Sequence, residues 1–300
     1  MAKTLATIGY AIVVRDLPPR PGCVLETATL QRQSGEAQLS FEGRKVTVNP
    51  PADVYEISVV VNAHREGLIA ASTLRSVERA AVHAQRAGIR VEPIIVLDRG
   101  DNLTRLVCSE WCSKGASRIL YDTQYGDLGL ARNEGAIRAK GEWLAFVDAD
   151  DLIGENWLTD AFGAAVSDSR PVVWHPELNI AFGSESYVYV HVDMESPFFD
   201  VSAIAITNLW TALTFSRRSM FLKVPYRATQ LSKQIGFEDW GWAMETIEAG
   251  YIHKIVEGTV HAIRKKTVSL VQQTTAAQCL PTPSDLFIRT ISSGVLEAQK

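Results

Sequence analysis

Three carboxylates follow directly on an apolar segment near the middle of the chain. Residues 143–147 are apolar or aromatic, Gly141 precedes them, and Asp148, Asp150 and Asp151 come directly after them. A short apolar run of this kind predicts a buried β-strand. Ligands of open α/β sheets bind beyond the carboxyl ends of the strands, and acids clustered there repel one another unless a cation compensates them. The spacing therefore predicts a site for a cation or a cation-bound ligand.

Alternating strand and helix patterns must position this acid cluster. Strands are expected at residues 55–62, 91–98, 118–121 and 143–148, and helices at residues 68–87, 103–112 and 128–139. Short β segments separated by helices predict βαβ units in a mostly parallel open sheet, which is an α/β fold.

The second half of the chain is less regular. We expect β segments at residues 172–175, 187–192, 203–207 and 212–216, and a helix at residues 239–249 that ends at Gly250. These elements predict added mixed strands and a helix, which form one wall of a cleft whose floor is the first half.

Composition narrows the class of protein. The chain has 300 residues, 46% of them hydrophobic, which is enough to bury a full core. A net charge of −4 argues against a nucleic-acid-binding protein, which needs a basic face. No apolar stretch approaches the ~20 residues of a membrane span, and the first residues do not resemble a signal peptide, so we expect a cytoplasmic protein. The cysteines lack metal-type spacing and are expected to be reduced thiols, namely Cys23, Cys108, Cys112 and Cys279.

Four segments in order resemble the family 2 glycosyltransferases of the GT-A fold. They are SVVVNAHRE (58–66), IIVLDRGDN (94–102), GLARNEGAIRAKGEWLAFVDADD (129–151) and GFEDWGWAMETIEAGY (236–251). The resemblance spans about residues 55–261. It implies an inverting enzyme that transfers a sugar from a nucleotide diphosphate sugar to an acceptor hydroxyl with the help of Mg²⁺ or Mn²⁺.

The residue pattern of the first segment and the resemblance of the rest together predict a domain organisation. Residues 1–53 would be an N-terminal β extension, with a hairpin at residues 38–48 and a Pro-rich joint at its end. Residues 54–270 would be the GT-A domain, whose first part, 54–155, binds the nucleotide sugar and whose second part, 156–270, binds the acceptor. Residues 271–300 would be a C-terminal tail or helix.

The D-x-D pair is assigned to the donor. A divalent cation neutralises the diphosphate as its bond to the sugar breaks, and this needs hard oxygen ligands. The resemblance gives Asp150 the direct metal contact and places Asp148 nearer the ribose or sugar, with Ala149 between them. Asp151 would support the metal or cap the following helix.

Further donor contacts come from the first two strand ends and from a helix. Ala63 and Glu66 would line the nucleotide pocket, Asp98 would bind the nucleotide base, and Arg132 would contact a phosphate or hold the Asp98 and Asp148 carboxylates. Asp98 is alternatively a helix cap, Glu66 a helix-terminus partner, and Arg132 an exposed helix residue. The sequence Asp98-Arg99-Gly100-Asp101 departs from the two acids and glycine that are frequent in the family, so the base identity stays open.

The acceptor hydroxyl must lose its proton, and the resemblance gives that role to Asp239 with Glu238 beside it. The alternative is that Asp239 is a helix N-cap. Trp240 is the candidate for stacking on an acceptor sugar, although tryptophans commonly lie in the core. His261 would complete the metal shell. The basic run at residues 264–266 would screen the diphosphate or form a solvated surface.

Two other classes of protein share part of this pattern. A haloacid dehalogenase-type phosphatase also carries D-x-D with Mg²⁺, but on the first strand of its core, whereas three β segments precede Asp148 here. A silent glycan- or nucleotide-binding module would not need Glu238 and Asp239. The expected partners are a nucleotide sugar and a glycan, glycolipid or other hydroxyl acceptor, without nucleic acid. Peripheral association with the inner face of a membrane stays open.

Overall fold

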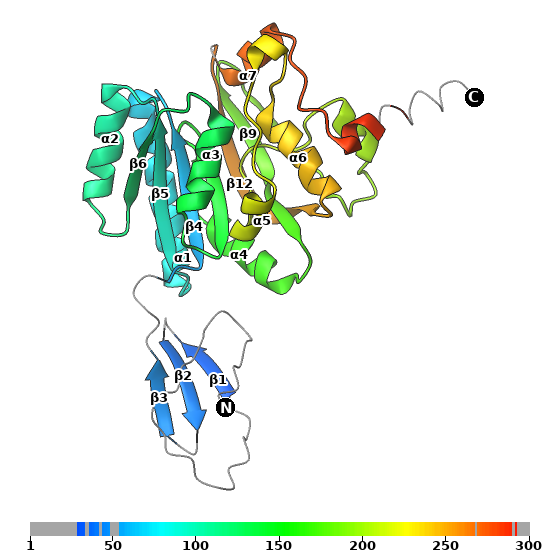
Figure 1. The fold of residues 1–300 in the computed structure, drawn as a ribbon. Helices are drawn as coiled ribbons and strands as arrows, with labels where there is room; N and C mark the ends of the chain where they lie inside the picture. Colours follow the sequence, from blue (N-terminus) through cyan, green and yellow to red (C-terminus); the bar gives the residue numbers. More distant parts are fainter. Residues whose placement is uncertain are drawn as a thin grey trace, which may run out of the picture. The chain divides into compact units, whose positions relative to one another are not determined.

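The computed structural model describes residues 29–33, 36–41, 44–48, 54–267, 269–289 and 292. The chain divides into two units, residues 1–49 and 50–300 (Figure 1). The Pro-rich joint and Cys23 lie outside the described residues. No helix within the described ranges is both long enough and apolar enough to cross a bilayer.

The first unit contains a small antiparallel sheet. Its strands are β1 (Thr29–Gln33), β2 (Glu36–Phe41) and β3 (Arg44–Val48), in the order β1-β2-β3. Phe41 pairs with Arg44, so two residues connect β2 to β3. This register confirms the predicted hairpin.

The first half of the second unit is a set of parallel strands with helices between them. The strands are β4 (Ile57–Ala63), β5 (Val91–Asp98), β6 (Ile119–Thr123) and β7 (Trp143–Asp148). The helices are η1 (Gly67–Ile69), α1 (Ala70–Arg86), α2 (Asn102–Ser113) and α3 (Leu128–Arg138). The order β6-β5-β4-β7, with parallel pairing throughout, confirms the predicted βαβ units.

The second half extends the same sheet with strands of both directions. Its strands are β8 (Leu152–Ile153), β9 (Val172–Gly183), β10 (Tyr187–Val190), β11 (Phe215–Arg217) and β12 (Ile252–Lys265). Its helices are α4 (Trp157–Ser167), η2 (Val201–Ala205), α5 (Arg218–Lys223), η3 (Leu231–Lys233), α6 (Glu238–Glu248) and α7 (Leu270–Ala276). The order continues β7-β11-β9-β12-β8, with β11 antiparallel to both neighbours and β12 parallel to β9.

One predicted strand is wrong, and two observed strands, β8 and β12, were not predicted. Residues 203–207 fall largely in the 3₁₀ helix η2, because the Asp200 side chain accepts a 2.8 Å hydrogen bond from the Ser202 backbone and caps it. Strand β12 was missed because its register shifts between Val256 and Val260, around Gly258. This irregularity interrupts the alternation that identifies a strand.

The core lies on both faces of the large sheet. One cluster packs the sheet against α1, α2 and α4, and the other packs it against α3, α5 and α6. Alternation along β4 places Val59 and Val61 in the first cluster and Val60 in the second. A Cβ on Gly135 would lie 2.5 Å from Val60 Cγ1, so this glycine lets α3 lie close to the sheet. Close packing of α3 fixes the position of Arg132, one turn before Gly135.

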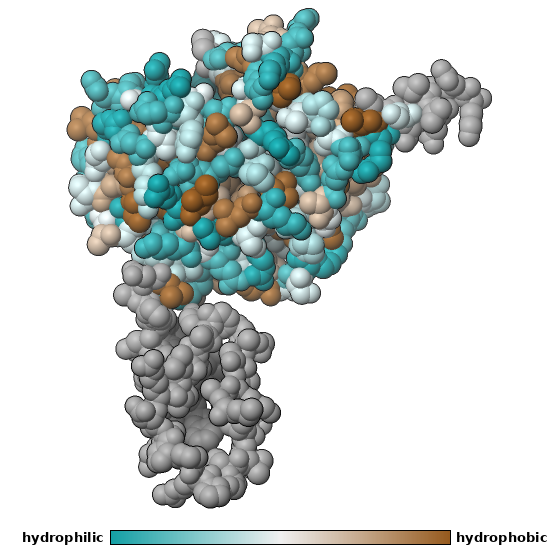
Figure 2. Space-filling view, in the orientation of Figure 1, coloured by the Kyte–Doolittle hydropathy of each residue, from teal (hydrophilic) through white to brown (hydrophobic). Residues whose placement is uncertain are grey.

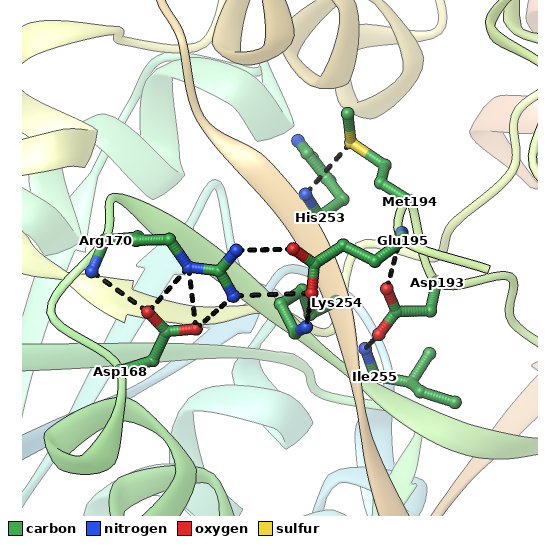
Figure 3. Close-up of polar contacts among 8 residues, drawn as sticks. All are labelled: Asp168, Arg170, Asp193, Met194, Glu195, His253, Lys254 and Ile255. Atoms are coloured by element: carbon green, nitrogen blue, oxygen red, sulfur yellow. Dashed lines mark hydrogen bonds and ion pairs between the residues drawn. The ribbon is translucent and has the colours of Figure 1, made fainter.

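A surface network holds one end of β12. Arg170 pairs with Asp168 at 2.7 Å and with Glu195, and Glu195 also pairs with Lys254 on β12 (Figure 3). Asp193 accepts a hydrogen bond of 3.2 Å from the Ile255 backbone. These contacts join the start of β9 and the segment after β10 to β12, whose other end reaches the acid cluster. On the face that Figure 2 shows, apolar side chains are scattered among hydrophilic ones.

Candidate active site

The parallel strands bring the predicted donor residues to one edge of the sheet. Asn62 on β4 pairs with Asp148 on β7, and Ala63 pairs with Leu97, one residue before Asp98. The Ala149 backbone N–H donates to the Asn62 carbonyl over 2.9 Å, which fixes the turn after β7 against β4. The side chains of Asp148, Asp150 and Asp151 each have different partners.

Arg132 connects the two halves of the site. Its Nη2 donates to both Asp148 carboxylate oxygens at 3.0 Å, and its Nη1 donates to Glu238 Oε1 at 2.9 Å. The residue is only 1% exposed, and its guanidinium lies 5.2 Å from the Tyr226 ring centroid. Burial disfavours its charge, but the charges of Asp148 and Glu238 outweigh burial and raise the pKa of Arg132. The alternative of an exposed helix arginine is wrong.

The neighbour of Arg132 on α3 fixes the wall beside it. The Asn133 amide accepts from the Tyr226 N–H and donates to the Tyr226 carbonyl, each over 2.9 Å. This pair of hydrogen bonds holds the segment before α6 against α3, so the Tyr226 ring stays under the Arg132 guanidinium.

Glu238 and Asp239 begin α6, and neither caps it. The N-cap is Phe237, with φ 54° and ψ 59°, and it makes no side-chain cap hydrogen bond, so the N-cap alternative for Asp239 is wrong. Asp239 Oδ2 accepts from Asn208 Nδ2 at 3.1 Å. Burial and the charge of Asp239 raise the pKa of Glu238, while burial raises the pKa of Asp239 against the opposing charge of Arg132. Both carboxyls therefore hold a proton more readily than ordinary acids.

Asp150 faces two cations from the end of β12. Lys266 Nζ lies 2.7 Å from Asp150 Oδ2, and Arg264 Nη1 lies 3.6 Å from the same oxygen. The charge of Asp150 also acts on Glu66. Burial and this charge raise the pKa of the Glu66 carboxyl, although the hydrogen bond from the His64 backbone opposes them. Two members of the basic run at residues 264–266 therefore contact the D-x-D motif rather than only solvent.

Asp151 and His261 form a separate pair. His261 Nε2 lies 3.1 Å from Asp151 Oδ2, and its Nδ1 lies 3.2 Å from Thr211 Oγ1. Asp151 Oδ1 accepts from the Arg264 backbone N–H over 2.8 Å. The N-cap of α4 is Asn156, so Asp151 does not cap that helix. Asp151 instead ties β12 to the turn after β7, and the metal role of His261 stays a prediction.

The residues around Asp150 are compatible with a shared metal. Within the part of the chain that the structure describes, no group of three or more His, Cys, Asp or Glu side chains could hold a metal ion. Mg²⁺, however, is commonly bound by one or two carboxylates together with substrate phosphates. The Asp150 carboxylate already attracts two positive groups. A cation held between Asp150 and a diphosphate therefore fits this donor set.

Asp98 holds the loop before α3. Its carboxylate accepts hydrogen bonds from Thr123 Oγ1 at 2.9 Å, from the Gly126 backbone at 2.7 Å and from the Asp127 backbone at 3.2 Å. The cap of α2 is Asp101, which accepts from the Thr104 backbone over 2.8 Å, so Asp98 is not that cap. Binding of the nucleotide base by Asp98 stays a prediction.

Trp240 lies at the edge of a third apolar cluster. Its Nε1 donates to the Ile204 carbonyl over 2.6 Å, and its ring meets that of Phe237 edge to face at 5.8 Å between centroids. The acceptor role of Trp240 stays a prediction. Sequence reasoning missed Asn208, the hydrogen-bond donor to Asp239, because it lies in an irregular segment without a motif.

Comparison with known proteins shows the family and the fold of the chain. The model of glycosyl transferase family 2 matches residues 58–209. GgaB of Bacillus subtilis, a minor teichoic acid biosynthesis protein, is 26% identical over 102 residues, which are 34% of this chain and 11% of GgaB. The chain therefore spans a small part of that relative.

Two solved structures show the same fold. A fragment of S. aureus TarS in complex with UDP-GlcNAc has a TM-score of 0.54 at 17% identity and covers 72% of this chain and 60% of its own. The mannosyltransferase PcManGT from Pyrobaculum calidifontis, in complex with GDP-Man and Mn²⁺, has a TM-score of 0.53 at 15% identity, with 73% and 60% covered. The fold is the predicted GT-A fold. Because the family model matches more than half of the chain, this protein belongs to glycosyl transferase family 2.

Proposed function

We propose that the protein is a metal-dependent inverting glycosyltransferase, which moves a sugar from a nucleotide diphosphate sugar to the hydroxyl of a glycan or glycolipid. One observation carries the proposal. Arg132 bonds Asp148 at the predicted donor side and Glu238 at the predicted acceptor side. Two carboxylate sites with different tasks are thereby held in one geometry, as a two-substrate reaction requires.

Asp150 and Asp148 serve the donor. A divalent cation on Asp150 would neutralise the charge that develops on the leaving diphosphate. Both carboxylate oxygens of Asp148 accept hydrogen bonds from Arg132, so this side chain is held in one orientation. A fixed carboxylate suits orientation of the donor better than direct binding of the metal. Glu66 and Asp98 contribute at the ends of β4 and β5. The structural neighbours carry UDP-GlcNAc, UDP, or GDP-Man with Mn²⁺, which supports a nucleotide sugar but leaves both the uridine and the guanosine class as candidates.

Asp239 acts as the general base. As the acceptor oxygen bonds to the anomeric carbon, the bond from that carbon to the diphosphate oxygen breaks, and the hydroxyl proton passes to Asp239. A base with a raised pKa is suited to this task near neutral pH. Glu238 is held by Arg132 and positions the pair rather than taking the proton.

The acceptor is proposed as a cell-surface glycan or its lipid-linked precursor. Similarity to GgaB, named for minor teichoic acid biosynthesis, supports this class. The acceptor side is built from α6 and from the segment that contains Asn208.

The proposal is tested by incubating the full chain with UDP- and GDP-sugars and Mn²⁺, and by measuring release of the nucleoside diphosphate with and without a chelator. The expected result is release that needs metal and increases with acceptor, with an inverted anomeric centre by NMR. Inorganic phosphate release from phosphoesters would support the phosphatase alternative, and nucleotide binding without turnover would support a silent module. Either result contradicts the proposal.

A further inference from the structure

The charge partners of Asp150 bear on the order in which metal and donor bind. Asp150 Oδ2 accepts from Lys266 Nζ at 2.7 Å, and the Arg264 guanidinium is 3.6 Å from it. The Asp150 side chain is 10% exposed, so it has little room for a further partner. A divalent cation that binds this oxygen must displace the lysine or lie against two like charges.

The two cations differ in their freedom to move. The backbone of Arg264 lies within β12 and donates to Asp151 over 2.8 Å, which fixes that residue. Lys266 follows the last residue of β12, and its side chain is 35% exposed. An ammonium on a flexible stem can leave for water without becoming a buried unpaired charge.

We propose that Lys266 is a displaceable counter-ion, which competes with the divalent cation for Asp150 until the diphosphate of the donor is present. The inference rests on the proposed metal role of Asp150. The two negative phosphates compensate both the entering cation and the released ammonium. Metal and nucleotide sugar therefore bind together, and metal alone binds weakly.

Lys265 provides a matched control. It is the adjacent residue and carries the same charge, but its Nζ lies 5.7 Å from the Tyr187 ring centroid rather than beside Asp150. Substitution of Lys265 changes the net charge as substitution of Lys266 does, without releasing Asp150.

The test is a Mn²⁺ titration of the full chain, with free Mn²⁺ measured by EPR, in the absence of nucleotide and in the presence of UDP or GDP. Lys266→Met is expected to tighten Mn²⁺ binding without nucleotide by about tenfold, a size typical for the effect of one close opposite charge on a carboxylate. Lys265→Met is expected to leave this affinity unchanged, and Lys266→Arg to keep it near the wild-type value.

Two results would overturn the inference, and they differ from each other. If Lys266→Met binds Mn²⁺ no more tightly than wild type, while nucleotide-dependent Mn²⁺ binding is lost in Asp150→Asn, the competition does not occur although the metal site is real. If Asp150→Asn binds Mn²⁺ like wild type in every condition, the metal role of Asp150 is contradicted as well.

Discussion

Arg132 and Glu238 are 106 positions apart in the sequence, and a 2.9 Å hydrogen bond between Nη1 and Oε1 joins them inside the protein. The same guanidinium binds both oxygens of Asp148. Because β7 and α6 carry these two acids, the arginine on α3 makes their spacing a property of the fold.

Arg132→Met is expected to impair both stability and activity. It leaves the Glu238 carboxylate buried without its cation, and breaking a buried pair costs about 3–5 kcal/mol. The free energy of unfolding from urea denaturation checks the first effect, and nucleoside diphosphate release checks the second. Arg138→Met is the control, because Arg138 lies on the same helix but pairs with Glu134 at the surface, where loss of an ion pair has little effect on stability. Equal losses in both variants would contradict the bridging role.

The sequence contains enough to predict the first half of the sheet and the acid cluster. Strands β5 and β7 have the predicted bounds, because each is a mostly apolar segment that is buried on both faces and ends in an acid; Glu92 interrupts the apolar residues of β5. The family resemblance carried this prediction to Asp148, Asp150 and Asp239, which the structure places around Arg132 and the end of β12.

The contacts that depend on distant segments could not be predicted. Nothing in the pattern of α3 indicates that Arg132 is buried, since Glu238 completes its surroundings from α6. Likewise, Lys266 and Asp150 are 116 positions apart, and the bulged strand β12 that brings them together has no clear alternation. Pairing between strands decides these positions, and a local pattern does not record it.

Asp150 and Asp151 are adjacent, and their substitution is expected to have different effects. Asp150→Asn should abolish the rise in melting temperature that Mn²⁺ with a nucleoside diphosphate produces, because a ligand stabilises only the state that binds it. Asp151→Ala should keep that rise but lower the free energy of unfolding by about 1–3 kcal/mol, since it removes the acceptor of the partly buried Arg264 N–H and the partner of buried His261. Thermal shift with and without metal checks both. Loss of the metal-dependent rise in both variants would show that Asp151 also serves the metal.

Asp239→Asn is expected to separate chemistry from binding. Removal of a general base lowers kcat by about 10²–10⁴-fold, whereas nucleotide affinity should not change because the proposed mechanism assigns Asp239 to the acceptor. Single-turnover kinetics and calorimetry with the nucleoside diphosphate measure the two quantities. Glu245→Gln, on the same helix and paired with Arg227 at 3.0 Å near the surface, is the control and should behave as wild type.

The pH dependence of the wild-type enzyme gives a second check on Asp239. Burial raises the pKa of this carboxyl. When the pH is lowered, Asp239 therefore takes up a proton, and ceases to be a base, at a higher pH than an ordinary aspartate does. We expect kcat to decline on the acid side with a midpoint above the usual 3.8. A decline centred at or below that value would contradict the assignment.

Three buried histidines predict unfolding in mild acid. His175, His191 and His253 are at most 3% exposed. The rings of His175 and His253 stack on each other and on Trp210, and His191 meets the His175 ring edge to face. Burial lowers the pKa of His191 and of His253 to about 3 and that of His175 well below 6.5. The unfolded chain therefore takes up protons that the folded chain does not, as pH falls below about 6.5.

Above pH ~6.5 the three histidines do not lower the free energy of unfolding. Between pH ~6.5 and pH ~3 they lower it by about 4 kcal/mol per pH unit, because three groups contribute. Since a domain is stable by only about 5–15 kcal/mol, tryptophan fluorescence should report unfolding between pH ~5 and ~4. His191→Gln should reduce the slope of unfolding free energy against pH by about one third. A slope that is the same in wild type and His191→Gln would mean that other groups cause the acid unfolding.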